Sequence, residues 1–119
     1  MYELVFWKYS EGIYLNHQLV YESLMDEEEV VGLEELPVTL IRNRINSLFS
    51  KWEKVDDNSW KNQAGKGAFH IRMTPKSVQI DCYGTEGKTM NILVEALAEF
   101  KCPLYDPQVP MRYDEMSED

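Results

Sequence analysis

The fold is decided by the stretch from residue 68 to residue 83, AFHIRMTPKSVQIDCY. Apolar and polar side chains alternate on both sides of a turn sequence, Thr74-Pro75-Lys76. This alternation predicts a β-hairpin with one buried face. The buried face would carry Phe69, Ile71, Met73, Val78, Ile80 and Cys82. The opposite face would carry His70, Arg72, Gln79 and Asp81, and would be free to bind another molecule.

The segments on either side of the hairpin predict one strand and three helices. Residues 4–7, LVFW, are apolar on both faces and predict a strand inside the sheet. Apolar residues at three- and four-residue steps predict a helix over residues 38–52, begun by Pro37, and another over residues 89–102, ended by Pro103. A shorter helix is predicted within residues 14–25, with Asn16 as its N-cap.

The remaining segments carry weaker signals. Residues 53–67 predict a loop or a weak edge strand, and residues 104–113, interrupted by Pro107 and Pro110, predict turns or a short edge strand. The order of elements predicts a single α+β domain over residues 1–113, in which an antiparallel sheet with a central hairpin packs against two or three helices. Residues 114–119, DEMSED, predict an acidic, disordered tail.

Charge is distributed unevenly along the chain. The net charge is -9, and residues 9–41 contain eight acidic residues but no Lys or Arg. Nucleic acid and anionic lipid reward clustered Lys and Arg, so this distribution argues against both as partners. It favours a positively charged protein instead. The absence of a long apolar stretch and of a basic N-terminal segment predicts a cytoplasmic protein that does not enter a membrane.

Seven of the acidic residues form the predicted partner-binding surface. They are Glu22, Asp26, Glu27, Glu28, Glu29, Glu34 and Glu35. The apolar residues Val30, Val31 and Leu33 lie among them, and would either anchor a partner inside an acidic rim or belong to the core. A solvated loop or helix end is the structural alternative for the charge run. A calcium loop fits the run poorly, because its alternating ligands and central Gly are missing.

Two other surfaces are alternative binding sites. One is the polar hairpin face, through His70, Arg72 and Asp81. The other is the turn that contains Tyr105 and Asp106. An Asp-Pro pair beside a Tyr is also typical of a turn that closes the chain onto its core, so this second surface has a purely structural alternative.

The sequence contains no motif that supports catalysis. Asp81, Glu86 and Lys88 superficially match a metal-dependent nuclease pattern, but such carboxylates must converge from neighbouring strands, and these lead out of a hairpin into a loop. His17 and His70 are the only histidines, and nothing in the pattern brings them together. Phosphate-binding loops and nucleophile elbows are absent. We therefore expect a protein that is not an enzyme, without catalytic residues, metal or cofactor.

The two cysteines predict structural thiols. Cys82 and Cys102 are 20 residues apart without a Cys-x-x-Cys spacing, so we expect them to be reduced and inert.

The main rival to a binding protein is a small-molecule-binding or enzymatic α+β domain with a pocket under the sheet, walled by Trp7, Trp52 or Trp60. An acidic subunit of a larger complex is a second rival. The oligomeric state does not follow from the sequence.

Four segments give the chain a family resemblance. They are residues 4–9 (LVFWKY), 32–37 (GLEELP), 80–84 (IDCYG) and 99–108 (EFKCPLYDPQ). In these segments the chain resembles small bacterial proteins of polymorphic toxin systems, including the immunity proteins of contact-dependent growth inhibition. The resemblance covers most of the chain, and its motifs are not catalytic. It implies a cytoplasmic protein that binds a cognate toxin domain and blocks its active site or its substrate path.

Overall fold

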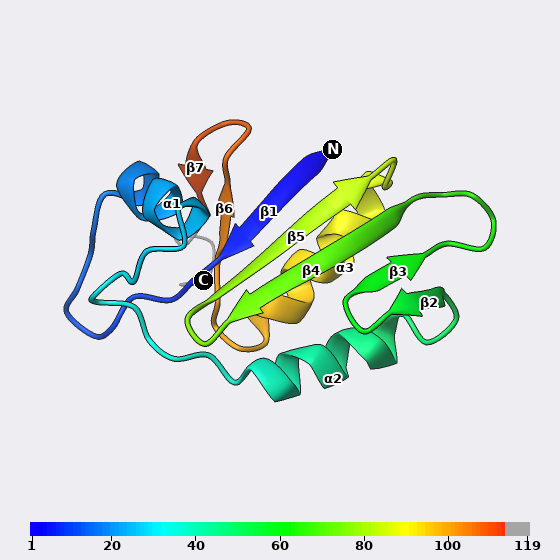
Figure 1. Cartoon of the computed structure of the whole chain (residues 1–119), viewed down its shortest axis with the longest axis horizontal. Coiled ribbons are helices and arrows are strands. Elements are labelled where there is room, and N and C mark those ends of the chain that lie inside the picture. The colour runs from blue at the N-terminus through cyan, green and yellow to red at the C-terminus, as the bar shows by residue number, and fades with distance from the viewer. Residues whose placement is uncertain (114–119) are drawn as a thin grey trace.

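The computed structural model describes residues 1–113, in which the chain forms seven strands and three helices (Figure 1). The strands are β1 (Tyr2–Phe6), β2 (Glu53–Asp56), β3 (Ser59–Lys61), β4 (Ala68–Thr74), β5 (Ser77–Tyr83), β6 (Leu104–Asp106) and β7 (Met111–Arg112). The helices are α1 (His17–Met25), α2 (Val38–Leu48) and α3 (Gly87–Ala98). All strands join one antiparallel sheet in the order β2-β3-β4-β5-β1-β6-β7.

This arrangement confirms the predicted α+β class and the hairpin at the centre of the sheet. β4 pairs with β5 along its whole length, and β1 pairs with β5 on one side and β6 on the other. The first strand is therefore internal, as its two apolar faces predict. The predicted tail, residues 114–119, lies outside the described residues.

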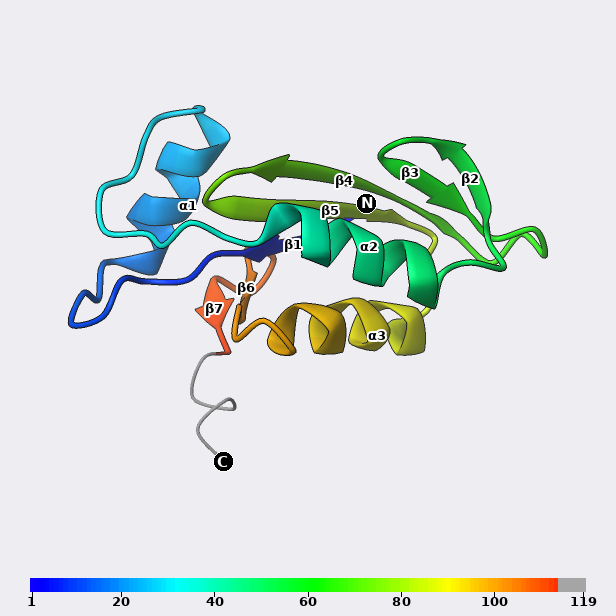
Figure 2. The ribbon, with the colours of Figure 1, turned by 90° about the horizontal axis from the view of Figure 1, so that it is seen from below.

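The apolar face of the hairpin forms the main core. Opposed pairs such as Ile71 and Ile80 lie side by side on this face, and both are fully buried. Helices α2 and α3 cover it from one side (Figure 2), through Ile41 and Ile45 of α2 and Leu93 of α3 among others. The strand period of two and the helical period of 3.6 both bring their apolar residues to the same layer, which is why these elements are readable from the sequence.

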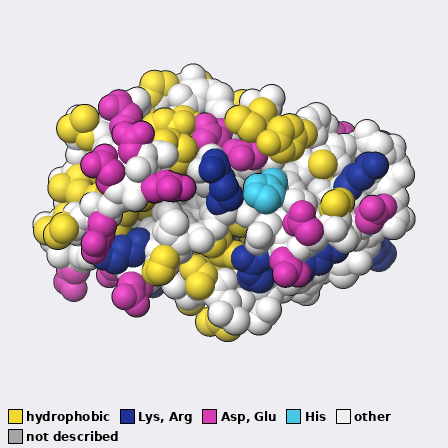
Figure 3. Space-filling model, viewed as in Figure 1, with side chains coloured by type: hydrophobic (Ala, Val, Ile, Leu, Met, Phe, Trp, Pro, Cys, Tyr) yellow, Lys and Arg dark blue, Asp and Glu magenta, His cyan; other side chains and the backbone are white. Residues whose placement is uncertain are grey.

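A second, smaller core lies on the opposite face of the sheet. It consists of Val5, Trp7, Val20, Leu33 and Tyr105. Helix α1 supplies Val20 and covers the part of the sheet formed by β1 and β6. The polar face of the hairpin, predicted to be free, is open only in part, because Arg72 of β4 is exposed and His70 is half-buried, whereas Gln79 and Asp81 of β5 are each 7% exposed. Basic and histidine side chains are visible near the middle of the molecule in Figure 3.

Helix α1 starts as predicted but differs from its prediction in its buried side. It begins at His17, after Asn16 accepts a hydrogen bond from the backbone N–H of Leu19 at 3.0 Å, so the predicted N-cap is confirmed. Leu19 is 61% exposed, whereas Val20 is 3% exposed. The helix buries the side that faces Val5 and Tyr105, because those residues offer the apolar surface on that side of the sheet.

The predicted weak edge is a two-stranded ribbon, β2 and β3. Every residue of β2 is exposed, but Trp60 of β3 is 1% exposed. Its ring stacks on that of Phe69 in β4, with ring centres 5.1 Å apart. Helix α2 ends at Leu48, earlier than predicted, and Phe49 and Trp52 continue the core from outside the helix.

Candidate protein-binding groove

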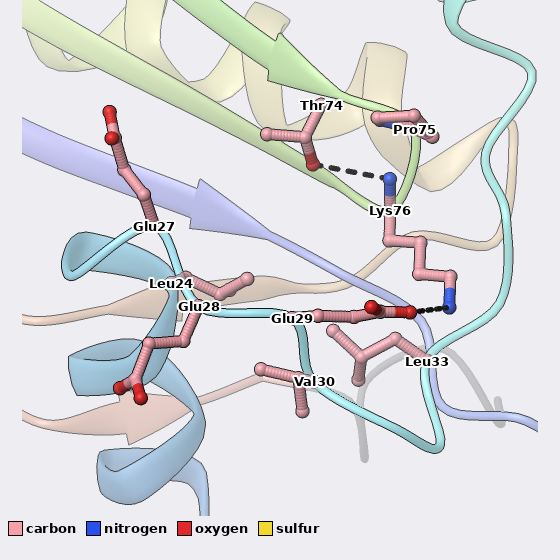
Figure 4. Close-up of a pocket in the computed structure, with 9 residues that line it drawn as sticks. All are labelled: Leu24, Glu27, Glu28, Glu29, Val30, Leu33, Thr74, Pro75 and Lys76. Atoms are coloured by element: carbon pink, nitrogen blue, oxygen red, sulfur yellow. Dashed lines mark hydrogen bonds and ion pairs between the residues drawn. The ribbon is translucent and has the colours of Figure 1, made fainter.

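A groove with a volume of about 420 Å³ lies between the C-terminal end of α1 and the turn of the β4–β5 hairpin (Figure 4). We call it the acidic groove. Its apolar part is lined by Leu24, Val30, Leu33 and Pro75. Its polar part is lined by Glu27, Glu28, Glu29, Thr74 and Lys76. Charged and polar side chains thus border an apolar floor, an arrangement typical of the rim and centre of a protein interface.

The acidic side of the groove is built by the way α1 ends. The backbone N–H of Glu28 donates to the carbonyl of Ser23 at 2.9 Å, and that of Glu27 donates to the carbonyl of Leu24 at 3.1 Å. These two bonds form a Schellman motif, in which the residue after the C-cap adopts the left-handed conformation. Glu27 occupies that position with φ 60°, where Gly is the favoured residue. The motif turns the chain sharply and leaves residues 26–29, the acidic loop, exposed.

The three glutamates of the groove point in different directions. Glu29 points across the groove toward Lys76, whereas Glu27 and Glu28 point away from it on either side (Figure 4). All three are exposed. Their charges are therefore available to a partner that approaches from solvent.

The apolar residues among the acids have separate roles. Leu33 is 4% exposed and belongs to the second core, and Val30 lines the groove while packing against that core. Val31 is 85% exposed. Leu33 therefore belongs to the core, whereas Val31 lies at the surface, where it could anchor a partner.

Lys76 forms the opposite wall of the groove. Its Nζ lies 4.0 Å from Oε1 of Glu29, and its backbone N–H donates to Oγ1 of Thr74 at 3.2 Å. Thr74 also shares a hydrogen bond of 2.8 Å with Ser77, which fixes the turn. Lys76 thus lines the groove, with its ammonium directed at a rim carboxylate.

A smaller cavity of about 100 Å³ extends the groove toward the polar face of the sheet. The two cavities share Leu24, Glu27 and Thr74. The smaller one continues to Arg72 and Gln79. A partner segment that lies in the acidic groove can therefore reach the open part of the sheet without leaving the surface.

The polar face of the sheet holds a connected chain of side chains. Gln79 donates to Oε2 of Glu3 at 2.5 Å and to Oδ1 of Asp81 at 3.2 Å. The hydroxyl of Tyr21 donates to Oε1 of Glu3 at 2.8 Å, and Nη2 of Arg72 lies 3.7 Å from Oδ2 of Asp81. Burial and the hydrogen bond to Glu3 raise the pKa of Tyr21 to about 12.

The buried polar side chains of this network form their hydrogen bonds with other side chains of the protein. Gln79 and Asp81 are each 7% exposed, so they contribute little contact surface. Arg72 is exposed, with 58% of its side chain accessible. His70 is half-buried, and its Nδ1 lies 2.8 Å from Oγ of Ser59. Figure 3 shows acidic, basic and histidine side chains together near the middle of this face. Arg72 and His70 are thus the accessible residues of this predicted alternative site, and Asp81 forms an ion pair with Arg72.

The structure brings together three of the seven acids predicted to bind a partner, Glu27, Glu28 and Glu29. Asp26 is the C-cap residue of α1 and is exposed beside them. The other three lie apart from the groove. Glu22 accepts a bond of 3.3 Å from Gln18, Glu34 pairs with Nζ of Lys8 at 3.1 Å, and Glu35 is exposed before α2.

Tyr105 and Asp106, the second alternative site, do not form a contact surface. They are 0% and 5% exposed. The hydroxyl of Tyr105 donates to Gln18 at 2.5 Å, and Asp106 accepts bonds from the hydroxyl of Tyr2 and the backbone N–H of Gln108. This segment forms β6, in which Tyr105 packs into the second core, and this burial favours the structural alternative for the Asp-Pro turn.

The residues considered for catalysis remain separate. His17 shares hydrogen bonds with Tyr9 at 2.8 Å and Tyr14 at 3.1 Å, in an aromatic cluster beside α1, whereas His70 contacts Ser59 on β3. In residues 1–113, no group of three or more His, Cys, Asp or Glu could hold a metal ion.

The two cysteines, Cys82 and Cys102, are buried, and burial raises their pKa values to about 11 and about 12.

The sequence matches no protein-family model and no curated protein. None of the helices formed by residues 1–113 has the length and apolar character needed to span a bilayer. The interpretation of the site therefore depends on its own geometry and charge.

Proposed function

We propose that this chain is an immunity protein that binds and neutralises a basic toxin domain, and that the acidic groove is its contact site. The observation that carries the proposal is the groove itself, in which Glu29 borders an apolar floor and Glu27 and Glu28 are exposed beside it. An apolar floor supplies contact area that is removed from water on binding, and the charged rim selects a partner of opposite sign.

The charge of the whole chain supports the same kind of partner. The net charge of -9 gives a long-range field that attracts a basic domain and repels nucleic acid. Complementary charge of this kind raises the rate of association and fixes the orientation of the encounter. An acidic protein that binds a basic cleft also blocks access to it by phosphate groups. A nuclease toxin fits the proposal, because its active cleft must present Lys and Arg to the substrate.

The contact between Lys76 and Glu29 indicates the side chains that the groove accepts. Lys76 lines the groove beside the apolar floor, and its ammonium lies at the carboxylate of Glu29. In general, a lysine side chain can bury its aliphatic stem against an apolar surface while its ammonium stays in water. Glu29 keeps 82% of its side chain exposed in this contact, so its carboxylate can accept further donors. Lys and Arg side chains of a partner can therefore bind in the same manner.

Co-expression with the protein encoded immediately upstream tests the proposal. We expect the chain to restore growth to cells that the upstream protein inhibits, and the two proteins to elute together as a 1:1 complex. An unrelated acidic protein of similar size serves as the control for non-specific charge effects. Absence of both rescue and complex would contradict the proposal.

A second candidate function, binding of a small ligand, is favoured by a cavity on the other side of the molecule. A cavity of about 380 Å³ lies between α3 and the sheet, lined by Tyr2 and Leu4 of β1 and Met90 and Val94 of α3 among others. Trp7 and Trp60 are fully buried in the two cores, so they do not provide the predicted walls. Ligand binding there would leave the growth of toxin-expressing cells unchanged, and this difference separates the two functions.

A further inference from the structure

Val31 presents an apolar side chain to solvent next to the acidic groove. It is 85% exposed, more than any other large hydrophobic residue in the described part of the chain. Its neighbour in sequence, Val30, lines the groove, and Glu29 is the rim residue that faces Lys76. Val31 is therefore linked to Glu29 in the sequence by a single residue, Val30, which lines the groove.

The backbone around Val31 is held in place by the neighbouring segment. The backbone N–H of Ser10 donates to the carbonyl of Gly32 at 2.8 Å, and Tyr9 and Leu33 form a β-bridge. Gly32 has φ +104°, and a Cβ at this position would lie 2.9 Å from Cγ2 of Ile13. The chain can approach Ile13 this closely only because residue 32 is Gly.

Ile13 thus lies against the residue that follows Val31, and we call these two exposed side chains, Ile13 and Val31, the apolar knob. Ile13 is 41% exposed where it packs against Gly32. Figure 3 shows hydrophobic and acidic side chains next to one another over the end of the molecule that carries α1. Exposed apolar side chains in a fixed loop cost little entropy when they bind, and apolar patches with a polar rim are typical of protein interaction sites.

We propose that the apolar knob is the anchor of the partner interface. It inserts into an apolar depression on the partner, and the carboxylates of the acidic loop contact Lys and Arg residues around that depression. This inference rests on the proposed function. It assigns separate roles to the two parts of the site, because exposed charges act mainly on the association rate and buried apolar contacts act mainly on the dissociation rate.

The knob is tested by binding kinetics with the immobilised protein encoded immediately upstream. Val31→Ser removes the anchor, and Val55→Ser is the matched control, since Val55 is 57% exposed on β2 at the far edge of the sheet. We expect Val31→Ser to raise the dissociation rate constant about tenfold, which corresponds to about 1.4 kcal/mol, and to change the association rate constant less than twofold. Val55→Ser should change neither.

Each outcome gives a distinct answer. A dissociation rate constant for Val31→Ser equal to that of the wild type would overturn the anchor role and leave the proposed function standing. A change confined to the association rate constant would also overturn it, because the knob would then affect only the encounter. Absence of binding by the wild-type chain would overturn the proposed function, and the inference with it. Thermal unfolding of both variants checks that the exposed substitutions leave the fold intact.

Discussion

Lys76, in the turn between β4 and β5, places its Nζ 4.0 Å from Oε1 of Glu29 in the acidic loop. The two residues lie 47 positions apart in the sequence and form opposite walls of the acidic groove. Because Glu29 keeps 82% of its side chain exposed, this ion pair contributes little to stability. In the proposed complex, this pair places a positive charge of the chain itself at the rim that the basic partner would approach.

Replacement of Lys76 by Met should accelerate association with a basic partner. The substitution keeps the aliphatic stem but removes the charge that competes with the partner at Glu29. We expect the association rate constant to rise about two- to threefold at low ionic strength, and the difference to disappear at high salt. Stopped-flow or biosensor kinetics measure it. Lys66→Met, in the exposed loop before β4, is the control with the same change in net charge and should have a smaller effect. Slower association of the Lys76 variant would place the partner's contact elsewhere.

Glu27→Gly should stabilise the fold, although it removes a surface glutamate. Glu27 has φ 60°, a conformation that costs a residue with a Cβ about 1–2 kcal/mol. Gly removes this cost, but part of the stabilisation is lost because Gly also increases the conformational entropy of the unfolded chain. We expect the free energy of unfolding to rise by about 0.5–1 kcal/mol in urea denaturation.

Glu28→Gly is the control. It makes the same chemical change outside the left-handed region, so it should lower the free energy of unfolding. Equal effects of the two substitutions would show that the conformation at position 27 is not strained.

Stability should decrease at alkaline pH because two hydrogen-bonded phenols and a buried thiol resist ionisation in the folded state. The pKa of Tyr2 is raised to about 12 by its hydrogen bond to Asp106 and by burial, and that of Tyr21 to about 12 by burial and its bond to Glu3. Burial likewise raises the pKa of Cys102 to about 12. Below their ordinary pKa values of about 9 to 10, these groups are protonated in both states, so their contribution to stability is complete.

Between about pH 9 and pH 12 the unfolded chain releases protons that the folded chain retains, so the free energy of unfolding falls as the pH rises. Urea midpoints across this range measure the slope. Tyr21→Phe removes one of the groups and should make the decrease less steep. A slope for Tyr21→Phe that equals the wild-type slope would contradict the assignment of a raised pKa to Tyr21.

The central hairpin, β1 and the helices α2 and α3 could be predicted because their apolar periods extend over several residues. The buried side of α1 could not. Leu19 fits the helical spacing but is exposed, because the sheet offers its apolar surface to Val20 instead. The sequence predicts only a loop or a weak edge strand for the ribbon of β2 and β3. The burial of Trp60 could not be predicted, because it depends on stacking against Phe69 of another strand rather than on a local pattern.

The candidate site was predictable only on one side. The charge run identified the acidic loop, but the other wall of the groove comes from Lys76 and its turn, and no local signal connects those segments. The burial of Tyr105 and Asp106 also depends on distant partners, Gln18 and Tyr2. A short strand flanked by prolines gives too few residues for a period, so its buried positions become clear only from the pairing of Tyr105 with Val5.

The dissociation constant of the complex with the protein encoded immediately upstream tests the central claim most directly, when it is measured for the wild type and for the double variant Glu27→Lys, Glu28→Lys. Both residues are exposed, so the variant should keep its free energy of unfolding within about 0.5 kcal/mol. We predict that its dissociation constant is about 100-fold higher than that of the wild type, because two attractive charges become repulsive. An unchanged dissociation constant in the folded double variant would contradict the claim that the acidic groove is the site of binding.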